Sequence, residues 1–438
     1  MRLLVFGKYP PIEGGTASQT YLTTRLIAEA GHGVDVVTNA EQAEPSVRAL
    51  MTDSDRVRLS EPPASPTGGW VKVHHTTALE DSSYVPWAKP FASQLFGLGS
   101  QLTETNDYDA VLGWYWEPYA LVAAQVATAA GIPLIVRHAG SDVGRLARQP
   151  ELRSAYRWLT KQADRILTGP GSAKLLEKLG ADPTILRMVE RGRIPEYFAS
   201  ADAMTDFEEL AALGADRYRS MGLSPSTRRV LVDNLARSGD LLGAPTIGIY
   251  GKVAESKGSY DLLSALDQVG ETRKITLLGA IGGPDGLHRS YLNQVARTDR
   301  IGQRAVLFPF IAPWRVPGFL DACSMVCVLE RRFDVPLHRS RVPQEVMSRG
   351  RPLVLSGEIA DKVPFRARLV PGQNYIRVDD PTDRHALADT LRSWLSDPAA
   401  LHEVGSRGRS LIEELGEWRR PDGPTVAITT ALAELVGG

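Results

Sequence analysis

Cysteines are scarce in this 438-residue sequence, and long apolar runs are absent. Only Cys323 and Cys327 occur, both in a segment that reads as buried, so the chain has no disulfide framework and a reducing cytoplasm is expected. No stretch approaches the ~20 apolar residues of a membrane-spanning helix. Residues 1–11 lead directly into a strand rather than forming a signal peptide. We expect a soluble protein, or one that touches a membrane only peripherally.

An excess of charge of either sign is also lacking. Fifty lysines and arginines stand against 51 aspartates and glutamates, which leaves a formal net charge of −1. Nothing in this balance indicates nucleic acid as a partner, so any cationic site must be local. Low-complexity tracts and short repeats are absent as well. A unit of strand, loop and helix recurs instead, and the length fits two domains of roughly 200 residues each.

The clearest such unit spans residues 245–266. An apolar run with a β-branched bias is followed by apolar residues at helical spacing. The loop between them contains two glycines and two lysines: Gly251, Lys252, Lys257 and Gly258. Ammonium groups beside flexible backbone at a helix start favour an anion, and two such lysines can converge on a departing diphosphate without a metal ion. A pair of solvated surface lysines is the alternative.

A second polar signal lies downstream, where residues 343–350 read as a short helix with Glu345 near its start. A buried strand follows it. Together the two segments resemble the nucleotide-sugar half of a GT-B glycosyltransferase, most closely the large retaining family 4. The equivalent segments of that family read G-R-L-x-x-x-K-G and E-A-M-x-x-G-x-P-V-V.

The resemblance implies an α/β fold with two Rossmann-like domains facing across a cleft, and it implies roles for individual residues. Lys252 stands where the family has arginine, so it keeps the charge but loses the bidentate fork. Lys257 matches the family's lysine, and both would stabilise the departing diphosphate beside Gly251. Glu345 matches the glutamate that accepts hydrogen bonds from the ribose hydroxyls. We expect neither a metal ion nor a cofactor.

Two loops of the N-terminal half resemble the same family. Gly14 and Gly15 follow the first strand, where family 4 carries a glycine loop at the mouth of the cleft, although paired glycines also suit a simple turn. Another strand runs into His138, as the family's strand ends in H-G-S-D or H-G-T-D facing the donor sugar. Ala139 is inserted here between the histidine and the glycine. The resemblance implies that His138 and Asp142 line the donor site, whereas a lone histidine can also be structural.

Aromatic residues gather where a further predicted strand ends: Trp114, Tyr115, Trp116 and Tyr119. Because ligands of open α/β sheets bind at the carboxyl ends of the strands, these residues predict a sugar-stacking or acceptor-binding wall made by Trp114, Trp116 and Tyr119. Aromatic packing in the core is the alternative.

The sequence departs from the family at one point. Family 4 usually has two glutamates with seven residues between them, and the position eight before Glu345 is Leu337. The loop carries His338, Arg339 and Arg341 instead. These cations suggest extra phosphate binding or a donor sugar with an anionic group, and ordinary surface arginines are the alternative.

The resemblance covers nearly the whole chain and implies its domain limits. Residues 1–200 would form the N-terminal acceptor domain, joined by a returning helix at 419–438. Residues 244–418 would form the nucleotide-sugar donor domain. Residues 201–243, where periodicity weakens and no strand is clear, are expected to form an elaborated, partly helical interdomain connection.

One helix of the N-terminal domain, expected at 151–166, carries cations every fourth residue: Arg153, Arg157, Lys161 and Arg165. Such a stripe could touch anionic lipid headgroups, which gives a peripheral membrane contact as one prediction. A solvated helix face is the alternative.

We therefore predict that the chain transfers a sugar, with retained anomeric configuration, from a nucleotide-diphosphate sugar to a small-molecule or lipid acceptor. The family favours UDP, while no residue reads the base, the sugar or the acceptor. An epimerase of nucleotide sugars with the same fold is one alternative. A non-catalytic nucleotide-sugar-binding subunit is another, and the missing first glutamate is its best argument.

Overall fold

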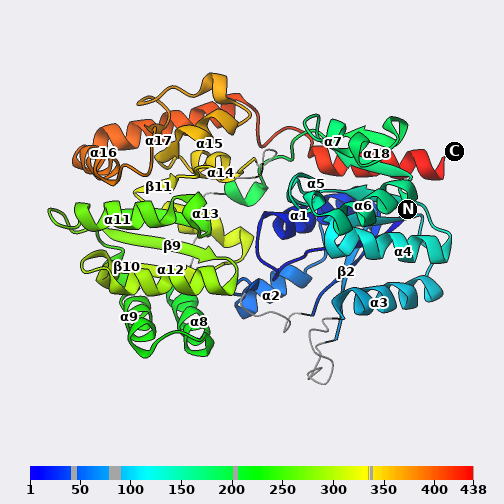
Figure 1. Cartoon of the computed structure of the whole chain (residues 1–438), viewed down its shortest axis with the longest axis horizontal. Coiled ribbons are helices and arrows are strands. Elements are labelled where there is room, and N and C mark those ends of the chain that lie inside the picture. The colour runs from blue at the N-terminus through cyan, green and yellow to red at the C-terminus, as the bar shows by residue number, and fades with distance from the viewer. Residues whose placement is uncertain (41–46, 78–89, 201–205, 334, 336–338, 438) are drawn as a thin grey trace.

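The computed structural model describes the whole chain except residues 41–46, 78–89, 201–205, 334, 336–338 and 438. Two α/β domains lie beside each other, each built around a parallel sheet with helices packed on it (Figure 1). Within the described residues, no helix is both long and apolar enough to cross a bilayer.

The N-terminal sheet has seven described strands in the order β3-β2-β1-β4-β5-β6-β7, all parallel. The strands are β1 (Arg2–Gly7), β2 (Gly33–Thr38), β3 (Trp70–His75), β4 (Ala110–Trp114), β5 (Leu134–Arg137), β6 (Arg165–Thr168) and β7 (Leu186–Met188). Alternation along β1 sends Leu4 and Phe6 into the core on one face and Leu3 and Val5 into the core on the other. The strand order reverses between β1 and β4, so a crevice is expected at their carboxyl ends.

Helices cover both faces of this sheet: α1 (Gly15–Glu29), α2 (Asp53–Ser60), α3 (Phe91–Thr105), α4 (Leu121–Ala130), α5 (Ser141–Gly144), α6 (Pro150–Gln162) and α7 (Ala173–Lys178). The last helix of the chain, α18 (Gly423–Val436), returns to this domain and packs against α1 and β5–β7. In Figure 1 the red α18 lies beside the N-terminal domain, far from the helices that precede it in sequence.

The C-terminal sheet has six described parallel strands in the order β10-β9-β8-β11-β12-β13. They are β8 (Thr246–Lys252), β9 (Thr276–Gly282), β10 (Ala305–Pro309), β11 (Met325–Val328), β12 (Leu353–Ser356) and β13 (Ile376–Val378). Its helices include α11 (Ser259–Val269), α12 (Asp285–Arg297), α13 (Val316–Asp321), α14 (Val342–Ser348), α15 (Gly357–Lys362), α16 (Arg384–Ser396) and α17 (Pro398–Glu414). The strand order reverses between β8 and β11. The loop that contains Lys257 follows β8, and the loop that contains Glu330 follows β11.

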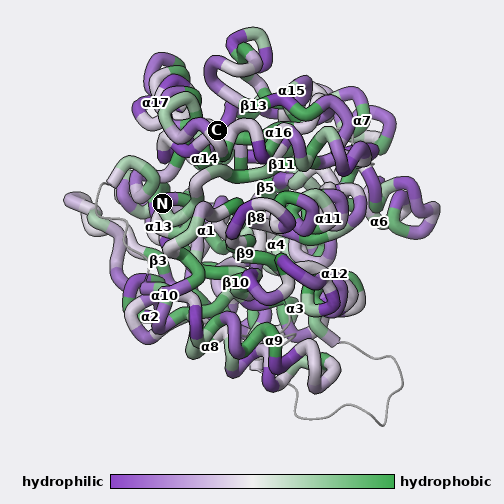
Figure 2. Tube along the Cα trace, turned by 90° about the vertical axis from the view of Figure 1, so that its left-hand side faces the viewer, coloured by the Kyte–Doolittle hydropathy of each residue, from purple (hydrophilic) through white to green (hydrophobic). Residues whose placement is uncertain are grey.

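Residues 206–243 differ from the expected connection. They form α8 (Phe207–Ser220), α9 (Pro225–Ala236) and α10 (Ser238–Leu241), and α8 and α9 pack on β10. Tyr218 is buried, and its hydroxyl donates to the Leu307 carbonyl at 2.9 Å. In Figure 2 these outer helices alternate hydrophilic and hydrophobic residues while β9 and β10 are largely hydrophobic. The helices therefore belong to the core of the C-terminal domain.

Candidate functional site

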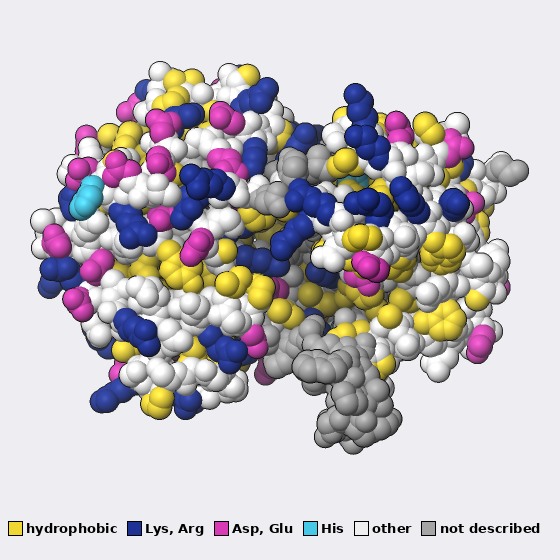
Figure 3. Space-filling model, viewed as in Figure 1, with side chains coloured by type: hydrophobic (Ala, Val, Ile, Leu, Met, Phe, Trp, Pro, Cys, Tyr) yellow, Lys and Arg dark blue, Asp and Glu magenta, His cyan; other side chains and the backbone are white. Residues whose placement is uncertain are grey.

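A cavity of about 1070 Å³ lies between the two domains, lined by the loops at the carboxyl ends of both sheets. Figure 3 shows Lys and Arg side chains gathered around the hollow between the two lobes. Most of the site residues predicted from the sequence line it: Gly14, Gly15, Trp114, His138, Gly251, Lys252, Lys257, Arg339, Arg341 and Glu345. The fold thus brings together segments more than three hundred residues apart.

The N-terminus of α1 opens on this cavity. Gly14 has a φ of 103°, a left-handed conformation that favours glycine, and no side chain caps the helix. The first bond of the helix runs from the amide of Ser18 to the carbonyl of Gly14, so the preceding amides have no acceptor within the helix. These amides and the positive end of the helix dipole favour an anion at this point.

Lys257 is held in place by an acid that the sequence analysis did not assign. Its Nζ donates to Oε1 of Glu330 at 2.5 Å and lies 3.7 Å from the centroid of the Phe333 ring. Burial lowers the pKa of Lys257, and the nearby Glu330 carboxylate opposes that shift. Gly258 follows with a φ of 70°, and a Cβ there would meet the Leu329 carbonyl at 2.3 Å. The signal for Glu330 is its place two residues after the end of the buried strand β11.

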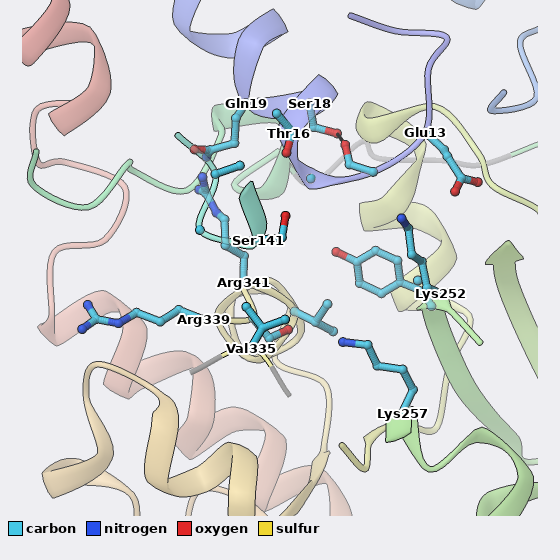
Figure 4. Close-up of a pocket in the computed structure, with 18 of the residues that line it drawn as sticks. Glu13, Thr16, Ser18, Gln19, Ser141, Lys252, Lys257, Val335, Arg339 and Arg341 are labelled. Carbon is cyan, nitrogen blue, oxygen red and sulfur yellow. Dashed lines mark hydrogen bonds between the residues drawn. The ribbon is translucent and has the colours of Figure 1, made fainter. Parts of the chain in front are cut away.

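Glu13 is a second acid that the sequence analysis passed over. It precedes Gly14 and faces Lys252 across the cavity in Figure 4. Burial raises the pKa of Glu13 to about 7, and the charges of Lys252 and Lys8 partly offset this rise. One of its oxygens, Oε2, is buried without a hydrogen-bond partner among the described residues.

Glu345 lies in the first turn of α14 with its carboxyl directed at the cavity wall. Tyr250, near the end of β8, donates its hydroxyl to Oε2 of Glu345. Burial raises the pKa of Glu345 to about 8. The carboxyl therefore carries less negative charge at neutral pH than an exposed glutamate would.

His138 is fixed at the end of β5 by a contact between its Nε2 and Oγ1 of Thr168 at 2.8 Å. Burial lowers the pKa of His138, so the ring is neutral at neutral pH. Its Nδ1 is buried and finds no partner in the described part of the chain. A neutral imidazole with one such nitrogen at a cavity can hydrogen-bond a ligand.

Asp142 does not line the cavity, so its predicted contact with the donor is wrong. It is fully buried, and its carboxylate accepts the backbone amides of Trp116 at 3.2 Å, Ala139 at 3.1 Å and Val143 at 3.0 Å. The carboxylate therefore organises the loop after β5, including the inserted alanine, rather than facing the ligand.

All three predicted acceptor aromatics are core residues, and Trp114 itself is 2% exposed. Trp116 is fully buried with its ring edge-on to Tyr156 at 5.1 Å, and Tyr119 is 2% exposed. Trp116 and Tyr119 do not line the cavity, because both lie in the helical turn Trp116–Ala120 that joins β4 to α4 and packs into the core. Trp114 and Tyr115 remain at the cavity wall.

Arg339 and Arg341 border the cavity on the side away from the lysine loop. Nη2 of Arg341 donates to the Arg193 carbonyl at 2.5 Å, whereas Arg339 is exposed. In Figure 4 the Arg339 guanidinium and the Lys257 ammonium point to opposite sides of Val335. Leu337 and His338 lie outside the described residues.

Residues 14–192 match the family model of the glycosyl transferase 4-like domain. No curated protein matches the sequence. Among solved structures, HepE of Anabaena in complex with UDP-glucose is 15% identical with a TM-score of 0.57, over 100% of this chain and 99% of that one. Sucrose-phosphate synthase of Thermosynechococcus elongatus is 16% identical with a TM-score of 0.59, again over 100% and 99%.

A protein of Listeria monocytogenes described as a UDP-N-acetylglucosamine 2-epimerase is similar in the same way. It is 12% identical with a TM-score of 0.52, over 99% of this chain and 95% of that one. At these identities the likenesses establish the arrangement of the two domains.

Proposed function

We propose that this chain, which has the GT-B fold and carries a glycosyl transferase 4-like domain at residues 14–192, transfers a sugar with retention from a UDP-sugar to a small-molecule or lipid acceptor. The observation that carries the proposal is the convergence of Lys252, Lys257 and the N-terminus of α1 on one cavity. The complex of HepE with UDP-glucose supports the choice of donor.

The two lysines and the helix terminus would stabilise the charge that develops on the leaving diphosphate. Because Glu330 and the Phe333 ring already hold Lys257, its ammonium needs little rearrangement when the bond breaks. The bond between the anomeric carbon and the diphosphate oxygen breaks, and its electron pair leaves with that oxygen. The acceptor hydroxyl bonds to the same face of the carbon and gives its proton to the diphosphate.

The remaining groups would position the donor. Glu345, steadied by Tyr250, would accept hydrogen bonds from the ribose hydroxyls, and the neutral His138 would hydrogen-bond the sugar through Nδ1.

Two cations of the stripe predicted to touch a membrane already have hydrogen-bond partners in the protein. Nε of Arg153 donates to the Ala147 carbonyl at 3.0 Å, and Nε of Arg165 donates to Glu434 at 2.7 Å. Membrane contact and cytoplasmic localisation stay predictions.

The test is a thermal-shift panel of UDP, GDP, ADP, dTDP and their sugar conjugates. A ligand at about 100 times its dissociation constant stabilises a protein by about 2.7 kcal/mol. We expect UDP to stabilise the wild type and to bind Lys257→Ala at least tenfold more weakly. Lys362→Ala is the matched control, because Lys362 pairs with Glu358 and does not line the cavity. Full turnover by Lys257→Ala, or the absence of any nucleotide shift, would overturn the proposal.

Epimerisation of a nucleotide sugar is the second candidate, favoured by the likeness to the Listeria protein. It is distinguished by incubating the enzyme with UDP-N-acetylglucosamine alone. An isomerised nucleotide sugar formed without any acceptor would support epimerisation, whereas product that appears only with an acceptor supports transfer.

A further inference from the structure

A smaller cavity of about 220 Å³ adjoins the main one and shares part of its wall. Neither Lys252 nor Lys257 lines it. Four arginines do, drawn from both domains: Arg137, Arg191, Arg339 and Arg341. Its volume equals roughly seven water molecules, which is room for a phosphoryl group.

Arg137 is the most unusual of these residues. It ends β5, and its guanidinium carbon lies 3.8 Å from the centroid of the Trp114 ring. Its Nη1 is buried and has no hydrogen-bond partner within the described residues. Burial lowers the pKa of Arg137 to about 9, and Asp422 is the one carboxylate that opposes this shift. A buried guanidinium nitrogen without an acceptor is costly, unless a ligand supplies one.

The buried carboxylates nearby are already occupied by other partners. Glu417 accepts from Arg191, from Nη2 of Arg420 at 2.9 Å and from Nε2 of Gln344 at 3.0 Å. Asp422 accepts the backbone amides of Arg193 and Thr425. Neither of these two acids lines the cavity; among the described residues, Glu190 is the one acid on its wall, and it is exposed. Cations thus outnumber acids around the cavity.

Neutral donors complete the wall. Gln19 and Ser340 contribute amide and hydroxyl groups. Nη1 of Arg191 is buried without a hydrogen-bond partner in the part of the chain that is described. Several such donors around a small cavity match the oxygens of a tetrahedral anion.

The smaller cavity is separate from the lysines proposed to hold the donor diphosphate, because neither Lys252 nor Lys257 lines it. Most of its residues come from the N-terminal domain: Arg137, His138, 167–169 and 189–192. An anion held here would therefore belong to a group other than that diphosphate. We propose that this cavity binds a phosphoryl group of the acceptor. The acceptor of the proposed transfer is then a phosphorylated small molecule, an inference that rests on the proposed function.

The first experiment titrates inorganic phosphate into UDP-saturated protein at constant ionic strength and follows the thermal shift. Arg339→Gln tests the exposed side of the cavity without risk to the core, and Arg137→Gln tests the buried side. Arg145→Gln is the matched control, because Arg145 is an exposed arginine on the main cavity that does not line the smaller one. We expect phosphate to stabilise the wild type and Arg145→Gln, and to bind both other variants at least tenfold more weakly.

Equal phosphate shifts in wild type, Arg137→Gln and Arg339→Gln would overturn the inference, and so would the absence of a shift in the wild type. The proposed function is read separately, from the UDP shift. If UDP does not bind, phosphate is titrated alone. Loss of its shift in Arg339→Gln but not in Lys257→Ala still reports on the smaller cavity.

The second experiment locates the anion on the acceptor or on the donor sugar. Sugar phosphates and their unphosphorylated parent sugars are compared as acceptors, with UDP-glucose as the donor. The binding of UDP-glucuronate is compared with that of UDP-glucose. We expect kcat/KM for phosphorylated acceptors to fall at least tenfold in Arg339→Gln, and kcat/KM for neutral acceptors to stay unchanged. A preference for UDP-glucuronate that disappears in Arg339→Gln would assign the cavity to the donor and overturn the inference.

Discussion

At the scale of a single residue, the surroundings of Glu13 change the pKa of its carboxyl. The carboxyl lies between the end of β1 and the first turn of α1, with the cation of Lys252 opposite it (Figure 4). Burial raises its pKa from 4.5 to about 7, which puts its titration near neutral pH. The folded state therefore binds a proton that the unfolded chain has already released between these two values.

Glu13→Gln should change how stability depends on pH. The contribution of protonated Glu13 to the free energy of unfolding is greatest below pH 4.5, and it falls as the pH rises towards 7. A glutamine does not titrate, so the variant should gain stability relative to the wild type as the pH rises, by at most about 3 kcal/mol above pH 7. Urea unfolding at pH 5 and pH 8 measures this difference. Glu255→Gln, at an exposed site in the lysine loop, is the control, and identical slopes for Glu13→Gln and wild type would contradict the prediction.

At the scale of elements, the start of α2 links the two domains. Asp55 caps this helix together with Thr52, and the same carboxylate accepts Nε1 of Trp314 at 2.6 Å and Nε of Arg315 at 2.8 Å. Asp55 is 2% exposed, so its charge depends on these partners from the other domain. One residue thus caps the start of a helix and joins the two domains.

Asp55→Asn should loosen this link with little change in volume. Breaking a buried ion pair costs about 3 kcal/mol or more when the remaining charge has no other partner. Arg315 keeps Glu209, whose Oε2 lies 3.3 Å from its Nη2, so we expect a cost towards the lower end of that range. We expect a lower urea midpoint and a larger radius of gyration in solution scattering. Asp53→Asn, at an exposed position of the same helix, should cost less than about 1 kcal/mol. A variant as compact and stable as the wild type would show that Asp55 does not hold the domains together.

For the molecule as a whole, the chain ends by completing the domain with which it began. Ile428, Ala431 and Leu432 of α18 are fully buried and share a core with Leu3 and Val5 of β1. Glu434 receives hydrogen bonds from Arg165 and Arg187, which hold the pKa of its carboxyl at about 2. The N-terminal domain is therefore incomplete until the last residues of the chain are in place.

Truncation before Gly423 should destabilise the N-terminal domain selectively. Losing two large buried side chains alone removes about 3 to 6 kcal/mol of burial energy. Hydrogen exchange should show lost protection in α1 and β5–β7 while β8–β13 keep theirs. Val426→Ser, at a side chain that is 49% exposed, should change neither region. Uniform loss across both domains would contradict the idea that α18 serves the N-terminal domain.

Local patterns predicted several of the strands, some of the helices and the loops that follow those strands. Gly14, Lys252, Lys257 and Glu345 could be found from the sequence because each lies in a short motif whose neighbours define it. The helices at 206–243 were within reach too. Leu210, Gly214 and Tyr218 of α8 are spaced four apart and buried, but the charged residues between them hid the pattern.

Only the tertiary structure decided which polar groups meet and which aromatic residues are covered. Lys257 and Glu330 are 73 residues apart in the sequence. Arg137 lines one cavity together with Arg339 and Arg341, which belong to the other domain. Which way a side chain points after a strand depends on the helix that packs there. Trp116 and Asp142 lie in the core away from the cavity, whereas Trp114 is buried and also lines the cavity. Periodicity is a property of neighbours along the chain, whereas burial and charge pairing depend on neighbours in space.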